Sequence, residues 1–445
     1  MKTAILALVP LLGCVADAPG YQTVTDDSVG VTVELPSSYQ VKKDPVLFDT
    51  HGFLVLAPGD GDGDEVARIA LAYQAKPADL ESLVATKLDK YKDLNPTRTE
   101  LTLADGRAAV AVTGLPGTHG YAVVYVADGD RVYEIGLWSL DGTIDDRGRD
   151  ILAHIKFEHP ARTIQSLNLR RAEEALHDPA PTAIAARNAI AHTERVAAYE
   201  AAKQADPALA YAASHETTLE PTRPRGPDGT AAAGCGFTAP SGMYWQLQWD
   251  GSNTFYSGSW YSLRGEPGWS AMSGNYGSWW GTNFHVGLCY ASYLNQYYAN
   301  DWPTQYWGNA YAAFSGYVEW AGWGTDGFAS LGRYVVVRNG QYRSLTAHLL
   351  SIESGISWGA WIDGYSTIIG YAGDTGEYYA GADWAPHLHA RVAWGESLTW
   401  NGQPYGGQSV GPSALRSFHC TNCDVDAAGS GGWYTDFYHG RWMKY

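Results

Sequence analysis

Histidines with the spacing of a metal site lie in the C-terminal half of the chain. His387 and His389 stand two residues apart, and on a β-strand two such residues point to the same side. Both imidazoles are therefore expected to face one cleft. A third histidine, His348, lies upstream in a strand-like run, and His285 and Asp301 precede it. Imidazole and carboxylate groups are zinc ligands, so the pattern predicts metal chemistry.

The order of these residues carries more weight than any one of them. Every histidine between residues 216 and 418 belongs to the set. An isolated His-x-His is weak evidence, because histidines on solvated strand faces are common. Scattered surface histidines would have no reason to follow the order of a metal site.

The order and spacing resemble those of the lysostaphin and β-lytic endopeptidase family of zinc metallopeptidases. Two further runs are similar to the strands of that family: residues 312–318, which end in Gly-Tyr-Val, and residues 332–337, which read Gly-Arg-Tyr-Val-Val-Val. The resemblance covers roughly residues 284–392.

The resemblance implies a role for each residue. His285, Asp301 and His389 would bind zinc, and His348 and His387 would act in catalysis. Three protein ligands leave the fourth position of a tetrahedral zinc to water, whose pKa the metal lowers to roughly 7. The two remaining imidazoles could move the proton and stabilise the oxyanion, and which does which stays open.

The second zinc ligand has two candidates. The compact family motif His-x-x-x-Asp is absent, because Cys289 stands at that spacing from His285. Either Cys289 is the ligand, or the loop is longer and Asp301 is. We favour Asp301, because it precedes Gly316 by the distance that the family usually keeps.

Two positions at the rim of the site also depart from the family. Thr346 stands where the family has Tyr, and Ala390 where it has Phe, which bears on substrate preference more than on metal binding. The predicted activity is hydrolysis of peptide bonds in peptidoglycan. The alternatives are an inactive wall-binding regulator of other hydrolases and a general secreted protease acting on Gly-rich protein.

The C-terminal region, residues 235–445, must position these side chains. All but one of the 18 Trp lie here, Gly is frequent, and charged residues are sparse. Short aromatic and β-branched runs between Gly-rich turns predict an all-β sandwich or barrel. The family resemblance implies a duplicated-hybrid-motif-like sandwich with a C-terminal extension.

The N-terminal region, residues 20–160, has a different composition. Strand-like runs at residues 31–35, 108–112 and 121–126 alternate with turn signals, and a helix is expected from Asp79 to Tyr91. This pattern predicts a small α+β domain. Its opening strand, residues 30–36, weakly resembles the PsbP-like sandwiches.

The two regions are joined by a helical segment and a linker. Residues 161–215 are rich in Ala, Glu and Arg, which favours helix, and Pro179, Pro181 and Pro207 divide the segment into short pieces. Residues 216–234 have the composition of a linker.

The first residues predict export. Met1-Lys2 and a short apolar run match a signal peptide, which is too short to span a bilayer permanently. The run ends in Leu-Leu-Gly-Cys14, which resembles the bacterial lipobox. Residues 1–13 would then be removed and Cys14 lipidated, anchoring the chain in the cell envelope. The alternative is an ordinary secretory signal cleaved near residues 16–18.

The other four cysteines are expected to form disulfides in an oxidising compartment. The expected pairs are Cys235 with Cys289 and Cys420 with Cys423. A four-Cys structural zinc site is the rival, with one pair at metal-type spacing.

Charge excludes one class of partner. Asp and Glu outnumber Lys and Arg by 47 to 30, which gives a formal net charge of -17. Nucleic acid is disfavoured, because basic side chains are too few to neutralise its phosphates.

Overall fold

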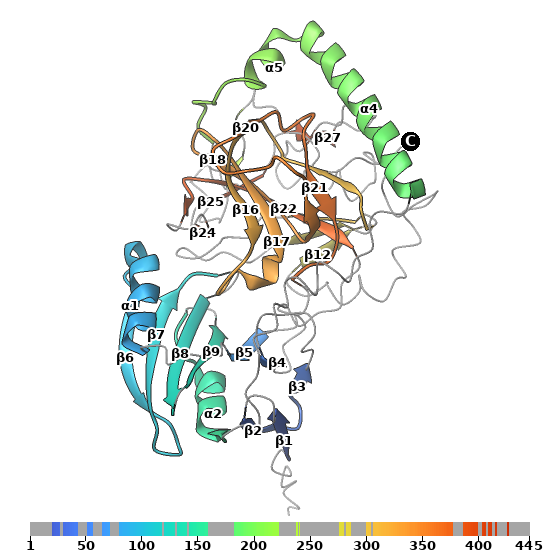
Figure 1. Ribbon diagram of the computed structural model, residues 1–445. Coiled ribbons are helices and arrows are strands. Elements are labelled where there is room, and N and C mark those ends of the chain that lie inside the picture. The colour runs from blue at the N-terminus through green and yellow to red at the C-terminus, as the bar shows by residue number, and fades with distance from the viewer. Residues whose placement is uncertain are drawn as a thin grey trace, which may run out of the picture.

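The chain is described from a computed structural model, which has a smaller N-terminal part and a larger C-terminal part (Figure 1). The structure describes residues 20–26, 30–42, 51–56, 65–71, 80–117, 120–129, 131–139, 142–158, 182–221, 237–238, 240, 276–279, 282–285, 300–303, 306–376, 386–398, 403–405, 408–411, 414–415 and 425–426. The predicted signal peptide and all five cysteines lie outside these residues, so lipidation of Cys14 and both disulfides remain predictions.

The N-terminal part is built on an antiparallel sheet in the order β3-β4-β5-β9-β8-β7-β6. Its strands are β3 (Gln40–Lys42), β4 (His51–Leu56), β5 (Glu65–Leu71), β6 (Thr97–Thr102), β7 (Ala108–Leu115), β8 (Gly120–Asp128) and β9 (Arg131–Ser139). A smaller sheet has the order β1-β2-β10, with β1 (Tyr21–Asp26), β2 (Val31–Pro36) and β10 (Ile155–Phe157).

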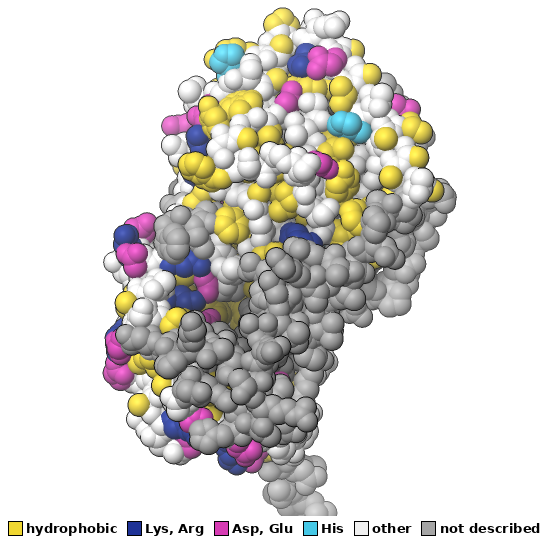
Figure 2. All heavy atoms as spheres, viewed as in Figure 1, with side chains coloured by type: hydrophobic (Ala, Val, Ile, Leu, Met, Phe, Trp, Pro, Cys, Tyr) yellow, Lys and Arg dark blue, Asp and Glu magenta, His cyan; other side chains and the backbone are white. Residues whose placement is uncertain are grey.

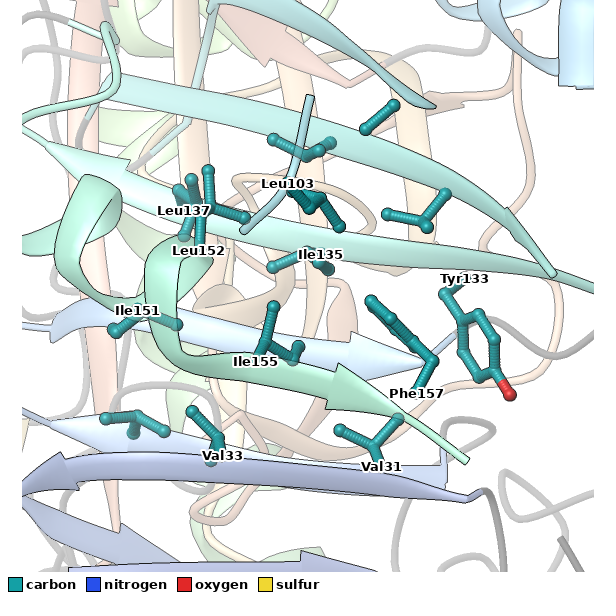
Figure 3. Packing of buried hydrophobic residues seen from close by; sticks show 14 of the residues in the cluster. Val31, Val33, Leu103, Tyr133, Ile135, Leu137, Ile151, Leu152, Ile155 and Phe157 are labelled. Atoms are coloured by element: carbon teal, nitrogen blue, oxygen red, sulfur yellow. The ribbon is translucent and has the colours of Figure 1, made fainter. Parts of the chain in front are cut away.

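Both faces of the large N-terminal sheet are covered. Alternate residues of β7 and β8 point to opposite faces, so each strand contributes to two cores. One core contains Val84 of α1 (Leu80–Lys90), a helix that is followed along the chain by η1 (Lys92–Leu94). The other lies between β9, the β2–β10 pair and α2 (Asp146–His154), where Ile135, Ile151 and Phe157 pack together (Figure 3).

The sequence-predicted elements of this part are present. The helix expected from Asp79 to Tyr91 is α1, and the three expected strands are β2, β7 and β8. The PsbP-like resemblance remains a prediction.

The C-terminal part is rich in β-strands, as the sequence predicts. Its main sheet runs in the order β12-β13-β14-β22-β18-β17-β16-β20, and β25 pairs with both β22 and β11. The strands are β11 (Phe237–Thr238), β12 (Tyr276–Trp279), β13 (Thr282–His285), β14 (Asn300–Pro303), β16 (Gly316–Trp323), β17 (Arg333–Asn339), β18 (Tyr342–Ala347), β20 (Trp361–Ile362), β22 (His387–Trp394) and β25 (Gln408–Gly411).

A second, three-stranded sheet has the order β15-β21-β19. It consists of β15 (Asn309–Tyr311), β19 (Leu349–Ile352) and β21 (Ile368–Ala372). Two short pairs, β23 (Ser397–Leu398) with β24 (Pro404–Tyr405) and β26 (Ala414–Leu415) with β27 (Val425–Asp426), follow near the C-terminus. Few charged side chains are visible on the described surface of this part (Figure 2), in keeping with its composition.

Helices lie against one side of the C-terminal part (Figure 1). α4 (Thr182–Ala205) and α5 (Pro207–Ala212) bury Tyr199 and Leu209 beside Tyr365. α4 is longer than the short pieces expected from the sequence, because no proline interrupts it between Pro181 and Pro207. Among the described residues, no helix is long and apolar enough to cross a membrane.

Candidate metal centre

Strand β22 brings two of the predicted site histidines into the middle of the main sheet. It begins at His387 and pairs with β14 on one side and β18 on the other. His389 is the register partner of Ala347 on β18 and of Asp301 on β14. Because β22 is flanked on both sides, His389 has little freedom of position, and only 3% of its surface is exposed.

His348 lies at a break between the two sheets. The sequence pattern places it inside a strand, and this prediction is wrong: β18 ends at Ala347, β19 begins at Leu349, and His348 has a φ of +62°. That left-handed conformation is uncommon outside Gly, although His adopts it more readily than most residues. Here it turns the chain from one sheet into the other.

Two hydrogen bonds hold His348 in this conformation. Its backbone N–H donates to the carbonyl of Leu331 (3.1 Å), and its ring Nδ1 lies 2.8 Å from the carbonyl oxygen of Thr375. A carbonyl only accepts, so in the neutral imidazole the proton is on Nδ1 and Nε2 is the acceptor. The structure therefore fixes both the orientation and the tautomer of His348.

Three buried imidazoles meet at this point. The ring centroid of His348 lies 4.6 Å from that of His387 and 5.6 Å from that of His389. The exposed fractions of His348 and His387 are 4% and 1%. Both β22 histidines thus lie beside the same third ring, as expected for residues two apart on a strand. Imidazole nitrogen is a ligand that zinc takes, and imidazole is a group that transfers protons near neutral pH.

The remaining two predicted ligands are placed by their backbones. β13, which ends at His285, pairs with β14, and β14 pairs with β22. Asp301 stands opposite Asn283 on one side and His389 on the other. The side chains of His285 and Asp301 lie outside the described residues. Among the residues whose side chains are described, no three His, Cys, Asp or Glu are grouped as a metal site, and the ligand set stays a prediction.

The residue types nevertheless fit zinc. Imidazole nitrogen and carboxylate oxygen are donors that zinc takes, and the strand register brings the backbone of Asp301 next to that of His389. The rival ligand, Cys289, lies outside the described residues.

Two supporting residues had no signal in the sequence. Leu331 and Thr375 hold His348 through their carbonyls, and Thr375 Oγ also donates to the carbonyl of Leu349 (2.9 Å). Thr375 stands in a Gly-Asp-Thr-Gly run, which indicates a turn. The run does not indicate which distant residue the turn will contact.

A buried ion pair lies further along β22. Arg391 Nη1 donates to Glu396 Oε1 (2.6 Å), and both side chains are almost fully buried. Burial raises the pKa of Glu396 above its usual value, while Arg391 acts to lower it. The pair closes the turn after β22 and so helps to fix the strand that carries His387 and His389.

Comparisons with known proteins give matches among solved structures. No protein-family model and no curated protein sequence matches the chain. Among solved structures, Csd3 from Helicobacter pylori in its orthorhombic crystal is 23% identical over 25% of this chain and 25% of that chain, with a TM-score of 0.18. In the hexagonal crystal, 85% of this chain and 74% of Csd3 align at 13% identity, with a TM-score of 0.22.

One further match is a mutant catalytic domain of the prophage-encoded M23 protein EnpA from Enterococcus faecalis. It is 17% identical over 26% of this chain and 78% of that chain, with a TM-score of 0.20. TM-scores of this size do not establish a shared fold or a shared activity.

Proposed function

We propose that the chain is an exported zinc metallopeptidase that hydrolyses peptide bonds of peptidoglycan. His285, Asp301 and His389 would hold the metal, and His348 and His387 would act on the substrate. One observation carries this proposal: three buried imidazoles meet at the start of β22, next to the strand on which Asp301 is in register with His389. The sequence resemblance to the lysostaphin and β-lytic family supports it.

The histidines supply proton transfer. Bound zinc would supply a water of lowered pKa, roughly 7, and would polarise the peptide carbonyl. His348, whose Nδ1 is engaged by Thr375, has Nε2 as its acceptor and is suited to take the proton of the attacking water. His387, 4.6 Å away between ring centroids, is suited to donate to the oxyanion and then to the leaving amine.

The substrate class is the finer part of the proposal. It rests on the family resemblance together with the predicted export signal, because the residues alone indicate only hydrolysis assisted by a metal. Zymography with purified wall, casein and elastin tests it. We expect clearing with wall and none with casein or elastin. Clearing of elastin or other Gly-rich protein without wall would favour a general secreted protease.

The activity itself is tested by metal analysis and turnover of the full mature chain on purified peptidoglycan. We expect about one zinc per chain, new peptide ends in the products and loss of both after His389→Ala. His215→Ala is the matched control, because His215 is an exposed histidine that follows α5 and does not belong to the predicted site. A zinc-loaded wild type that binds wall but releases no peptide ends would replace this proposal by a wall-binding regulator.

The proposal includes an anchor in the cell envelope through a lipid on Cys14. We expect metabolic labelling with a lipid precursor to mark the wild type and not Cys14→Ala. The same label on both chains would exclude Cys14 as the anchor.

A further inference from the structure

A buried carboxylate joins the N-terminal part to the C-terminal part. Asp326, in the loop before η4 (Ala329–Leu331), accepts hydrogen bonds from Lys87, from Lys90 (2.5 Å) and from the hydroxyl of Tyr91 (2.7 Å). The three donors come from α1 and the residue after it. The side chains of Lys87, Lys90 and Asp326 are each 10% exposed. Basic and acidic side chains also gather where the two parts meet in Figure 2.

The contact continues beyond the ion pairs. Gly117 forms a parallel bridge with Gly327, and a Cβ at Gly117 would lie 2.6 Å from the carbonyl oxygen of Gly327. The two backbones therefore approach more closely than any side chain would allow. Leu94 of η1 packs against the cluster that includes Phe328 and Leu331. Polar, backbone and apolar contacts all fall on one loop, residues 324–332, called here the docking loop.

The docking loop has a conformation that needs support. Asp326 has a φ of +56°, in the left-handed region, which costs free energy for a residue other than Gly and persists only where surrounding contacts impose it. Within the loop, Gly324 N–H donates to the carbonyl of Gly332 (2.8 Å), which closes it into a compact unit. The contacts from α1 are thus made to the one non-Gly residue of the docking loop that has a positive φ.

The far end of the docking loop holds His348. The carbonyl of Leu331 accepts from the backbone N–H of His348. Gly332, the next residue, lies so close to Thr375 that a Cβ there would be 2.2 Å from the Thr375 carbonyl oxygen, the acceptor of His348 Nδ1. Arg333 N–H donates to Thr375 Oγ (3.0 Å). The backbone and the ring of His348 are both fixed by groups at this end of the loop.

We propose that Asp326 is a positioning residue, through which the N-terminal domain fixes the docking loop and thereby orients His348. The consequence for turnover rests on the function proposed above, whereas the orientation of His348 does not. In this arrangement the N-terminal domain contributes to catalysis by holding His348 in its orientation.

Electrostatics favour a permanently charged contact. Burial alone would raise the pKa of Asp326, but the ammonium groups of Lys87 and Lys90 outweigh it and hold that pKa well below the usual range. Glu134, 3.6 Å from Lys87, supplies a second carboxylate for the two ammonium groups. The Asp326 carboxylate is thus charged at neutral pH. Removing its charge would leave the buried ammonium groups of Lys87 and Lys90 with less negative charge beside them.

The test compares Asp326→Asn with Glu81→Gln in the full mature chain. Asn adopts the left-handed conformation readily, so the first variant removes the charge and keeps the backbone shape. Glu81 of α1 forms an ion pair with Arg98 of β6 near the surface, away from the docking loop, and its replacement is the matched control. The readouts are the side-chain ¹⁵N NMR signals of His348, assigned with His348→Ala, and kcat and KM on purified peptidoglycan.

We expect Asp326→Asn to shift the His348 ring signals and to lower kcat about 10- to 100-fold with KM unchanged, as for a small displacement of a reacting group. Glu81→Gln should change neither. Unmoved His348 signals in a folded Asp326→Asn protein would overturn the proposal, whatever happens to turnover. Shifted signals in a chain whose wild type has no turnover would uphold the positioning and reject the peptidase. If Asp326→Asn does not fold, Lys90→Met, which removes the hydrogen bonds from Lys90 to Asp326 and Thr325, gives the same comparison.

Discussion

His348 and His387 are expected to act together on the substrate without holding the metal. Replacing either by Ala should leave zinc content and melting temperature near those of the wild type. Loss of a general acid or base typically lowers the rate about 10²–10⁴-fold, so turnover on peptidoglycan should collapse in both variants. The double variant should be little worse than the poorer single one, because residues that act as a unit are not additive. Loss of zinc from either single variant would move that residue into the ligand set.

Single substitutions also test which residue is the second zinc ligand. The register of Asp301 opposite His389 favours Asp301 over Cys289. Asp301→Ala and His285→Ala should each lose most of the zinc measured by mass spectrometry, whereas Cys289→Ser should keep its zinc and unfold more easily because a disulfide is lost. Full zinc in Asp301→Ala together with none in Cys289→Ser would reverse the assignment.

At the scale of single elements, regular strands and helices could be predicted from local sequence. The apolar, strand-like runs of β7 and β8 and the apolar face of α1 are local patterns, and both appear at the expected positions. The two-residue spacing of His387 and His389 likewise predicts that they share a side. These features depend only on neighbours along the chain.

Features made by distant residues could not be predicted. The kink at His348 depends on carbonyls of Leu331 and Thr375, and nothing in the local run signals them. Lys87 and Asp326 are 239 residues apart and look like ordinary surface charges in the sequence. A tertiary hydrogen bond or ion pair has no periodicity, so it leaves no trace in local composition.

Helix α4 offers a prediction at the same scale. Arg195 is fully buried, donates from Nε to the carbonyl of Tyr365 (2.8 Å) and lies 3.6 Å from the ring centroid of Tyr311. Arg195→Met keeps an apolar stem but loses the hydrogen bond and the cation–π contact, which should lower the free energy of unfolding by about 2 kcal/mol. Urea titration followed by Trp fluorescence measures this.

The control for that titration is Arg187→Met, because Arg187 is exposed on the same helix. A change within about 0.5 kcal/mol is expected there. Equal midpoints for the two variants would mean that the Arg195 contacts add no net stability.

At the scale of the whole molecule, α4 and the residues that follow α5 are hydrogen-bonded to the C-terminal part. Asn188 Nδ2 donates to the carbonyl of Trp307 (2.5 Å), and Asn309 Nδ2 donates to the carbonyl of Asn188 (3.1 Å). After α5, Thr217 N–H donates to Asn339 Oδ1 on β17 (2.6 Å). The start of the predicted linker is therefore attached to the main sheet.

These contacts predict how truncated chains fold. A fragment of residues 182–445 keeps α4 and α5, whereas residues 235–445 lose the partners of Tyr311 and Tyr365. Burying one large side chain contributes roughly 1.5–3 kcal/mol, so loss of Tyr199 and Leu209 together should destabilise the shorter fragment by at least about 3 kcal/mol. Urea titration of both fragments, followed by Trp fluorescence, measures the difference.

A synthetic peptide of residues 182–221, added in trans, should restore part of the stability that the shorter fragment has lost. The same peptide with Arg195→Met should restore less. Identical midpoints for the two fragments would show that the helices are dispensable to the fold.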